Sequence, residues 1–461
     1  MRLTVIGCGY LGAVHAAAMA DLGHHVLGVE TDPARLALLA RGQAPFYEPG
    51  LDELLRRGAR TGRLRYTAAL DGAAARADVH FLAVGTPQSP SGRGADLSHL
   101  WRAVDSLAAV LPRCVHPDGM PLVVGKSTVP VGTAQQVADR LAGRALVVWN
   151  PEFLRESMAV ADTLSPDRIV YGLPDEPARA ERARTILDEV YAPILAAGAP
   201  RLTMGYQTAE LVKTAANAFL ATKISFINAM SALCAATGAD VTVLADAIGR
   251  DARIGPHFLR AGLGFGGGCL PKDLRGLEQS AAELGANGLA SFLGRVDSIN
   301  RGQRDRVTQM ALEALGPNPA GRAVTILGIT FKPDSDDLRD SPVLEVALRL
   351  ADAGAVVTVH DPRGLAGLRR LHPVLRTQPD ALRALEGAEL VILGTEWKEL
   401  TDLDPEAAAA RVARPVLIDA RNALTPSRWT AAGWDYRGIG RASEPRRSAP
   451  RHRALAGTMV G

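Results

Sequence analysis

The length of 461 residues exceeds what one hydrophobic core usually supports, so two or three domains are expected. With 47% hydrophobic and 22% charged residues, the composition excludes a largely disordered chain. Residues 441–461 hold five arginines and one glutamate, which gives this segment a net charge of +4. Because the whole chain carries +3, residues 1–440 carry a net charge of −1. This nearly neutral remainder has no basic face for nucleic acid. The Arg/Pro-rich tail is predicted to be a disordered basic end, with partner binding as the alternative.

The four cysteines, Cys8, Cys114, Cys234 and Cys269, are far apart in the sequence and form no C-x-x-C pair. Neither a zinc site nor a disulfide framework is therefore predicted. Free thiols fit a reducing cytoplasm, and the chain opens into a strand rather than a signal peptide. No apolar run approaches the ~18 residues that span a bilayer. We expect a cytoplasmic protein without a metal site, a membrane partner or a nucleic-acid partner.

A dinucleotide-binding fingerprint stands at the start of the chain. An apolar strand at residues 3–6 leads into Gly7-Cys8-Gly9-Tyr10-Leu11-Gly12, and residues 13–22 are predicted to form a helix. Glu30 ends the next strand, about 20 residues on, where such sites place the acid that binds ribose. A carboxylate there accepts from a 2′-hydroxyl and repels a 2′-phosphate, so NAD is predicted, with Asp32 as an alternative acceptor. A tight turn without a nucleotide is the other interpretation.

Strands alternate with helices through the first 200 residues, which predicts a parallel, doubly wound sheet. Polar residues follow three of its strands, in Gly85-Thr86-Pro87, Lys126–Pro130 and Asn150–Glu156. Ligands of such sheets bind at the carboxyl ends of the strands, which favours a functional role for Thr128 and Glu152. Thr86 is equally compatible with helix capping.

One long helix is predicted from Tyr206 to Thr237, because neither Gly nor Pro interrupts these residues and Gly238 follows them. Lys213 and Asn217 are four residues apart, so their side chains project together. They either form a surface edge or line a cleft where they stabilise an oxyanion. A long apolar helix in mid-chain often buries a partner subunit, so we expect at least a homodimer.

The segment Arg253–Asp273 is the most unusual part of the chain. Four glycines between residues 264 and 268 precede Cys269. Such a run costs conformational entropy, which predicts positive φ angles or a close approach of the backbone to another group. We expect that group to be a bulky ligand. Lys272 and Asp273 follow within one helical turn. We therefore expect near the thiol a cation that lowers its pKa and a carboxylate that accepts or donates protons. This pattern indicates a nucleophile; the alternative is a structural cysteine in a flexible loop.

The alternation of strands and helices resumes after Gly316–Pro319. Residues 26–33 are echoed by residues 356–362, which favours a second nucleotide-binding unit, although chance could produce so short a match. Its first strand ends in Phe331-Lys332, which suits a base or a phosphate, and Arg421 follows its last strand. Two nucleotide-sized sites with a thiol between them describe an oxidoreductase that acts on a nucleotide-linked substrate.

The predicted fold is therefore α/β, with two Rossmann-like doubly wound parallel-sheet domains joined by a long central helix. Residues 1–200 form the NAD-binding domain, and residues 201–316 form a helical dimerisation region with the cysteine loop. Residues 317–440 form the second nucleotide-binding domain, and residues 441–461 form the basic tail.

These motifs resemble the UDP-glucose 6-dehydrogenase family, over the chain up to about residue 440. The resemblance implies that two NAD⁺ oxidise UDP-glucose to UDP-glucuronate, with UDP held by the C-terminal domain. Cys269 would form a thiohemiacetal and then a thioester that water hydrolyses. The motifs that carry the resemblance are the glycine fingerprint, Gly85-Thr86-Pro87, Lys126–Pro130, Asn150–Leu154, Lys213 with Asn217, Arg253–Asp273 and Gly328–Lys332.

The resemblance also implies individual roles. Lys213 and Asn217 would stabilise the oxyanion, Asp273 with Thr128 would position water or move protons, and Glu152 would assist hydrolysis. The implied NAD contacts are Gly7, Gly9, Tyr10, Leu11, Gly12, Glu30, Thr86, Thr128 and Lys272. The implied substrate contacts are Glu152, Phe153, Leu154, Glu156, Lys213, Asn217, Arg253, Phe258, Arg260, Phe265, Gly266, Phe331, Lys332 and Arg421, with Arg253 reaching the neighbouring subunit's site.

Three alternatives remain. GDP-mannose 6-dehydrogenase shares the cysteine loop, and the UDP-N-acetylhexosamine dehydrogenases resemble this chain less at that loop. A non-catalytic NAD-binding regulator belongs to another class, against which Cys269 and its polar neighbours argue together. The chain also departs from the family pattern at Gly268, where Ser is more frequent, and at Glu30, where Asp is more frequent.

Overall fold

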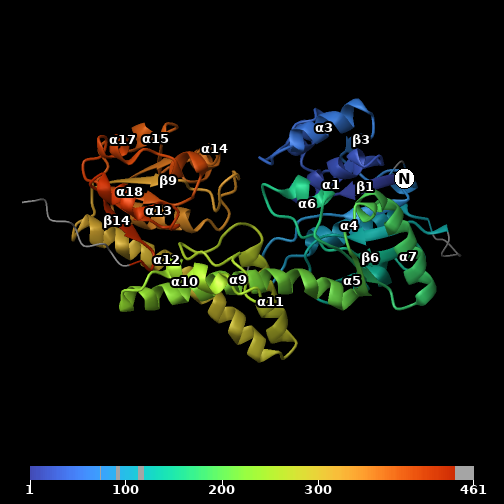
Figure 1. Cartoon of the computed structure of the whole chain (residues 1–461). Coiled ribbons are helices and arrows are strands. Elements are labelled where there is room, and N and C mark those ends of the chain that lie inside the picture. The colour runs from blue at the N-terminus through green and yellow to red at the C-terminus, as the bar shows by residue number, and fades with distance from the viewer. Residues whose placement is uncertain (73, 90–93, 113–118, 442–461) are drawn as a thin grey trace, which may run out of the picture.

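The computed structural model describes residues 1–72, 74–89, 94–112 and 119–441. Two α/β domains stand side by side, and helix α9 (Tyr206–Thr237) runs along the base of both (Figure 1). Helices α11 (Leu270–Glu283) and α12 (Asn287–Leu315) form a hairpin that projects away from the two domains. The predicted fold class is confirmed.

The N-terminal domain is built on an eight-stranded sheet with the order β3-β2-β1-β4-β5-β6-β7-β8. Strands β1, β4, β5 and β6 are almost entirely buried, as expected where helices cover both faces. The strands are β1 (Arg2–Ile6), β2 (His25–Val29), β3 (Leu64–Thr67), β4 (Val79–Leu82), β5 (Leu122–Gly125), β6 (Leu146–Trp149), β7 (Ile169–Leu173) and β8 (Arg201–Gly205). The helices are α1 (Tyr10–Asp21), α2 (Pro33–Ala40), α3 (Leu51–Arg60), α4 (Ser98–Val110), α5 (Thr133–Arg140), α6 (Ala159–Leu164), α7 (Pro177–Val190) and α8 (Ala192–Ala196).

This sheet departs from the prediction in one respect, because β7 pairs with β6 in the antiparallel direction. The last two strands, β7 and β8, are parallel to each other and opposite to the first six. The segment between β6 and β7 contains Glu152 and helix α6. It brings the chain back beside β6 in the opposite direction.

The C-terminal domain has a six-stranded parallel sheet with the order β11-β10-β9-β12-β13-β14. This order repeats that of the first six N-terminal strands, so the predicted second unit is confirmed. In both domains a glycine with a left-handed backbone follows the first strand: Gly7 (φ +86°) follows β1, and Gly328 (φ +84°) follows β9. The strands are β9 (Ala323–Leu327), β10 (Val356–His360), β11 (Arg376–Thr377), β12 (Leu390–Leu393), β13 (Val416–Asp419) and β14 (Asp435–Gly438). The helices are α13 (Pro342–Asp352), α14 (Leu365–Leu371), α15 (Ala381–Ala384), α16 (Lys398–Thr401), α17 (Pro405–Ala409) and α18 (Pro426–Ala431).

The central helix α9 has the predicted bounds and ends at the left-handed Gly238 (φ +76°). Within the described part of the chain, α9 alone is long and apolar enough, by length and composition, to cross a membrane. This corrects the expectation that no such run exists. Its packing against α11, α12 and β7 is that of a core helix that connects domains.

Arg441, the first residue of the predicted basic tail, belongs to the described part of the chain. Arg441 donates to Asp240 at 3.1 Å, at the N-terminus of α10 (Val241–Gly249). Residues 442–461 and Cys114 lie outside the described residues.

Candidate active site

The glycine fingerprint forms the turn between β1 and α1. A Cβ at Gly7 would lie 2.8 Å from the Cα of Val84, and a Cβ at Gly12 would lie 1.8 Å from the carbonyl oxygen of Gly7. Both positions therefore require glycine for packing. Space is open around Gly9, directly before the first residue of α1, so a pyrophosphate fits against the free N–H groups of the helix.

The predicted ribose acceptor Glu30 is buried at the end of β2. Its carboxylate accepts from the N–H of Asp32 at 2.8 Å and pairs with Arg35 at 2.9 Å. Asp32, the alternative acceptor, instead caps α2 by accepting from the N–H of Arg35 at 2.9 Å. Glu30 thus lies at the end of β2, where the ribose-binding acid was predicted, and both of its oxygens have protein partners.

The loops after β4 and β5 are joined by Thr86. Its hydroxyl donates to the carbonyl oxygen of Thr128 at 2.7 Å. Thr128, Lys272 and Asp273 line a small cavity of about 30 Å³. The rest of its lining is mainly apolar, from Val129, Pro130, Val131 and Leu277, and its volume suffices for one water molecule beside the polar groups.

The predicted nucleophile Cys269 is the residue that precedes α11, and Lys272 and Asp273 lie in the first turn of that helix. The two oxygens of the Asp273 carboxylate have different partners: Asn217 donates to one at 2.7 Å, and Lys272 donates to the other at 2.7 Å. The buried Asp273 therefore connects the cysteine loop to α9.

Lys213 forms an ion pair with Glu152 at 2.9 Å, and both side chains are largely buried. The second Glu152 oxygen accepts from the N–H of Leu154 at 2.6 Å. Burial disfavours the charged lysine, but the carboxylates of Glu152 and Asp273 outweigh it and raise the pKa of Lys213. The burial of Lys213 excludes the surface-edge interpretation for this residue.

The expectation that a nearby cation lowers the thiol pKa is wrong in this structure. Lys272 is engaged by Asp273, and Cys269 is an exposed residue whose sulfur nevertheless has many protein atoms around it. Burial raises the pKa of Cys269 to about 12, Glu152 adds to the rise, and Lys213 opposes it. This direction favours the thiol over the thiolate.

The glycines before Cys269 approach the C-terminal domain closely. A Cβ at Gly266 would lie 2.3 Å from the carbonyl oxygen of Asp340, and one at the left-handed Gly267 would lie 2.7 Å from the ring of Phe331. A Cβ at Gly268 would lie 2.6 Å from the guanidinium of Arg339. Side chains at these positions are therefore excluded by atoms of the C-terminal domain, whereas we expected a bound ligand to exclude them. At Gly268, the space of the more frequent serine side chain is taken by Arg339.

Side chains of the C-terminal domain form hydrogen bonds with the cysteine loop and with the loop after β6. The guanidinium of Arg421 donates to the carbonyl oxygens of Gly394 at 2.7 Å, Gly264 at 3.0 Å and Phe331 at 3.1 Å. Lys332 donates to the carbonyl oxygen of Glu156. The predicted substrate residues Phe331, Lys332 and Arg421 thus border the region between the two domains.

Glu156 lies where the two domains meet. Arg339 donates to its carboxylate at 3.3 Å, and Ser335 donates to it at 3.4 Å. Burial raises the pKa of Glu156 to about 7, and the charge of Asp337 adds to the rise.

A larger cavity, of about 470 Å³, lies along the loop that follows β6. The predicted substrate residues that line it are Glu152, Phe153, Leu154, Lys213, Asn217 and Phe258. Phe258 has a left-handed backbone (φ +62°) and is exposed.

Three predicted substrate residues are placed differently. The Arg253 side chain is 89% exposed and pairs with Asp251 at 2.7 Å, away from the other predicted residues. Arg260 is exposed, and its guanidinium lies 3.8 Å from Glu396. Phe265 is buried, and its backbone is held by Asn300.

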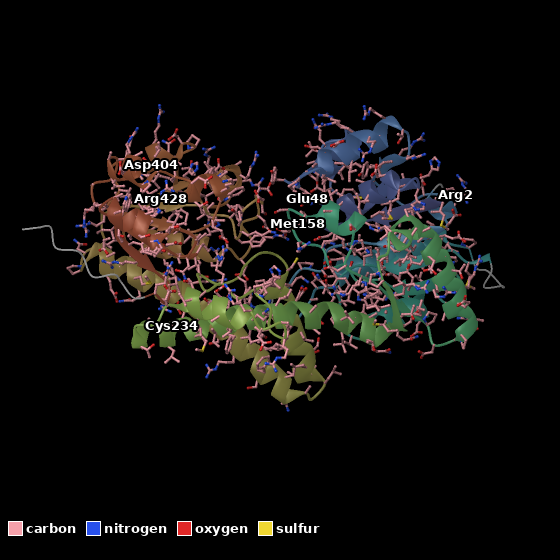
Figure 2. The ribbon with its side chains drawn as sticks, viewed as in Figure 1. Arg2, Glu48, Met158, Cys234, Asp404 and Arg428 are labelled. Carbon is pink, nitrogen blue, oxygen red and sulfur yellow. The ribbon has the colours of Figure 1, made fainter. Side chains whose placement is uncertain are left out.

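Several residues that shape the site were not identified from the sequence. Glu48 accepts from the hydroxyl of Tyr10 and from the N–H groups of Ser157 and Ala159, both at 2.8 Å. It thereby ties the cofactor turn to the loop after β6. Figure 2 shows Glu48 and Met158 on the side of the N-terminal domain that faces the C-terminal domain. No local pattern marks Glu48, whereas a polar Asn300 on the apolar face of α12 was a readable signal.

A cysteine, a buried lysine and two carboxylates between two nucleotide-binding domains define the class of this protein, an NAD-dependent oxidoreductase. Family models agree along the chain. Residues 1–195 match the NAD binding domain, residues 207–302 the central domain and residues 325–426 the UDP binding domain of the UDP-glucose/GDP-mannose dehydrogenase family. The chain belongs to this family.

Known relatives align over nearly the full length. The UDP-glucose 6-dehydrogenase of Pseudomonas aeruginosa is 41% identical over 458 residues, which cover 96% of this chain and 98% of the relative. The UDP-glucose 6-dehydrogenase of Rhizobium meliloti is 39% identical and covers 96% of this chain and 100% of the relative. A UDP-glucose dehydrogenase structure from Pyrobaculum islandicum superposes with a TM-score of 0.85 at 38% identity, covering 96% of this chain and 98% of that one.

Proposed function

We propose that this protein oxidises UDP-glucose to UDP-glucuronate with two NAD⁺, through a covalent intermediate on Cys269. The similarity to UDP-glucose 6-dehydrogenases over nearly the whole chain supports the substrate. The observation that carries the covalent route is the placement of Cys269 beside two groups, the Lys213–Glu152 ion pair and the Asn217–Asp273 hydrogen bond. An alcohol that is oxidised once needs no such thiol.

The bound NAD⁺ accepts one hydride from the sugar in each of two oxidations. Between them, the thiol of Cys269 adds across the aldehyde C=O: an S–C bond forms, and the thiol proton ends on the sugar oxygen. The raised pKa of Lys213 favours its charged form, and this charge is proposed to stabilise the negative oxygen that develops during the addition. The second oxidation converts the thiohemiacetal to a thioester.

Hydrolysis of the thioester requires water close to a proton acceptor. The small cavity beside Thr128, Lys272 and Asp273 has room for one water molecule next to these polar groups, which supports the role proposed for Thr128 and Asp273 in positioning water. Glu152 is proposed to assist the attack, because its carboxylate is held in place by Lys213 and by the N–H of Leu154. The thiol leaves as the carboxylic acid forms.

The cofactor is proposed to contact the residues of the glycine fingerprint, together with Glu30, Thr86, Thr128 and Lys272. The buried carboxylate of Glu30 would accept from the ribose 2′-hydroxyl, which favours NAD over NADP.

A homodimer is proposed from the exposed face of α9. Phe219, Phe226 and Leu233 follow one another at intervals of seven residues and are 66%, 52% and 56% exposed. A second copy of this chain would bury such a stripe. Arg253 is proposed to enter the neighbouring subunit's site, because its side chain is exposed and pairs only locally, with Asp251, among the described residues.

The domain limits proposed from the sequence are 1–200, 201–316 and 317–440. The end of α12 at Leu315 supports the limit between the second and third domains. Strand β8 (Arg201–Gly205) belongs to the N-terminal sheet, so the first domain extends to the start of α9 at Tyr206. A cytoplasmic location is proposed on the ground that Cys8, Cys234 and Cys269 are all unpaired.

The test is the amount of NADH formed per sugar. Purified protein with NAD⁺ and limiting UDP-glucose is expected to form two NADH per sugar, followed by absorbance. One NADH per sugar with an aldehyde product would contradict the role of Cys269. Parallel reactions with GDP-mannose and with UDP-N-acetylhexosamines separate the related substrates, and no turnover with any of them would favour a regulator.

A further inference from the structure

Three polar side chains meet in the interior behind the loop that carries Glu152. The ammonium of Lys126 donates to Oδ1 of Asn150 at 2.9 Å and to the hydroxyl of Tyr191 at 3.3 Å. The hydroxyl of Tyr191 donates to the same Asn150 oxygen at 2.7 Å, and the Asn150 amide donates to the carbonyl oxygen of Val170 at 2.9 Å. Both ends of the Asn150 side chain are therefore held.

Lys126 is a buried cation with neutral hydrogen-bonding partners. It is 7% exposed, and within the described part of the chain it forms no salt bridge with a carboxylate. Burial lowers the pKa of Lys126 to about 8, although the negative charge of Glu152 opposes the shift. Burying an ammonium without a paired carboxylate destabilises a fold. Packing alone does not explain this lysine, since a methionine would fill similar space without that penalty.

The position of Lys126 connects it to the reaction centre. It follows β5, two residues before Thr128, and Asn150 follows β6, two residues before Glu152. Lys126 and Asn150 line the same 470 Å³ cavity as Glu152 and Lys213. The cation thus stands behind the loop from which the proposed hydrolytic carboxylate projects.

The other titratable groups around Lys126 are uncharged at neutral pH. His15, from α1, is buried with no hydrogen-bond partner for Nε2 among the described residues. Burial and the nearby charge of Lys126 lower the pKa of His15. Burial raises the pKa of Tyr191, so it remains a phenol. Glu152 is therefore the charge that Lys126 acts upon.

We propose that Lys126 is a positioning residue for Glu152: it holds the loop through Asn150, and its positive charge attracts the Glu152 carboxylate during thioester hydrolysis. This inference rests on the proposed function. It predicts that Lys126 is retained for catalysis at the expense of stability.

The test compares Lys126→Met with the unchanged protein, and with Lys398→Met as a control because Lys398 is exposed on α16. In Lys126→Met, kcat is expected to fall by roughly ten- to a hundredfold, with KM for UDP-glucose changed less than about threefold. The melting temperature is expected to stay equal or rise.

Mass spectrometry of acid-quenched Lys126→Met is expected to show sugar bound to Cys269. The unchanged protein should also lose kcat above pH about 8, as Lys126 is deprotonated, a decline that Lys126→Met lacks.

Two outcomes would overturn this inference and leave the proposed function intact. One is a Lys126→Met variant with the kcat of the unchanged protein. The other is a loss of kcat with a lower melting temperature and no covalent adduct, which would show a structural role. If the unchanged protein itself does not oxidise UDP-glucose or a related sugar nucleotide, the proposed function is overturned and this inference with it.

Discussion

The side chain of Asn300 pairs with both backbone groups of Phe265, accepting from its N–H at 2.8 Å and donating to its carbonyl oxygen at 3.0 Å. Asn300 is fully buried in α12, and the neighbouring Gly264 has a left-handed backbone (φ +94°) whose Cβ would lie 2.4 Å from the Asn300 oxygen. One amide thus fixes the loop that leads to Cys269.

Asn300→Ala is therefore expected to weaken both stability and catalysis. It leaves the two buried polar groups of Phe265 without a partner, at about 1–3 kcal/mol each. A lower melting temperature and a lower kcat should appear together. Asn318→Ala, at an exposed turn, is the matched control, and equal effects of both substitutions would contradict the assignment.

Cys269→Ser is expected to abolish formation of the acid, because a serine hydroxyl is a far weaker nucleophile than the thiol it replaces. Product analysis of quenched reactions should show no UDP-glucuronate. Cys234→Ala, which removes a buried thiol on α9 remote from this chemistry, should retain activity. Ordinary turnover by Cys269→Ser would exclude the covalent route.

Glu152→Gln is expected to slow hydrolysis of the thioester, since an amide neither accepts a proton from water nor pairs with Lys213. A loss of about 10²-fold in kcat fits the usual contribution of a general base. The covalent adduct on Cys269 should accumulate in rapidly quenched samples. If both oxidations stop before any adduct forms, Glu152 acts earlier than proposed.

Stability should depend on pH through Glu156. Its pKa of about 7 lies above the 4.5 of an unfolded chain, so its stabilising contribution is complete below pH 4.5 and is lost as pH rises through 7. The change is on the order of 3 kcal/mol. Melting temperatures measured from pH 5 to pH 8 should fall more steeply for the unchanged protein than for Glu156→Gln, and parallel curves would show that Glu156 does not titrate in this range.

Phe226→Glu should disrupt the proposed dimer, because a charge in the middle of the apolar stripe on α9 cannot be buried without a partner. Light scattering coupled to size exclusion would measure the mass. Val374→Glu is a control, since Val374 is equally apolar and exposed but lies on the C-terminal domain. A dimer that survives Phe226→Glu would place the interface elsewhere.

The sequence by itself determined the elements whose signals are local. The glycine turn, the bounds of α9 and the second α/β unit follow from patterns within a few tens of residues, where glycine conformation and hydrophobic periodicity decide the structure. The grouping of Cys269, Asp273 and Lys213 was also anticipated, because the family pattern preserves them in order.

Tertiary structure alone decided the contacts between distant segments and the charge states that depend on them. Arg339 beside Gly268, Asn300 beneath Phe265 and Lys126 behind Glu152 join residues that no local pattern relates. The same holds for the thiol of Cys269: its neighbours in sequence suggested a lowered pKa, but its pKa is raised because folding packs protein atoms around the sulfur of this exposed residue and brings in the carboxylate of Glu152. Desolvation is a property of the assembled interior, so a linear pattern of residues does not contain it.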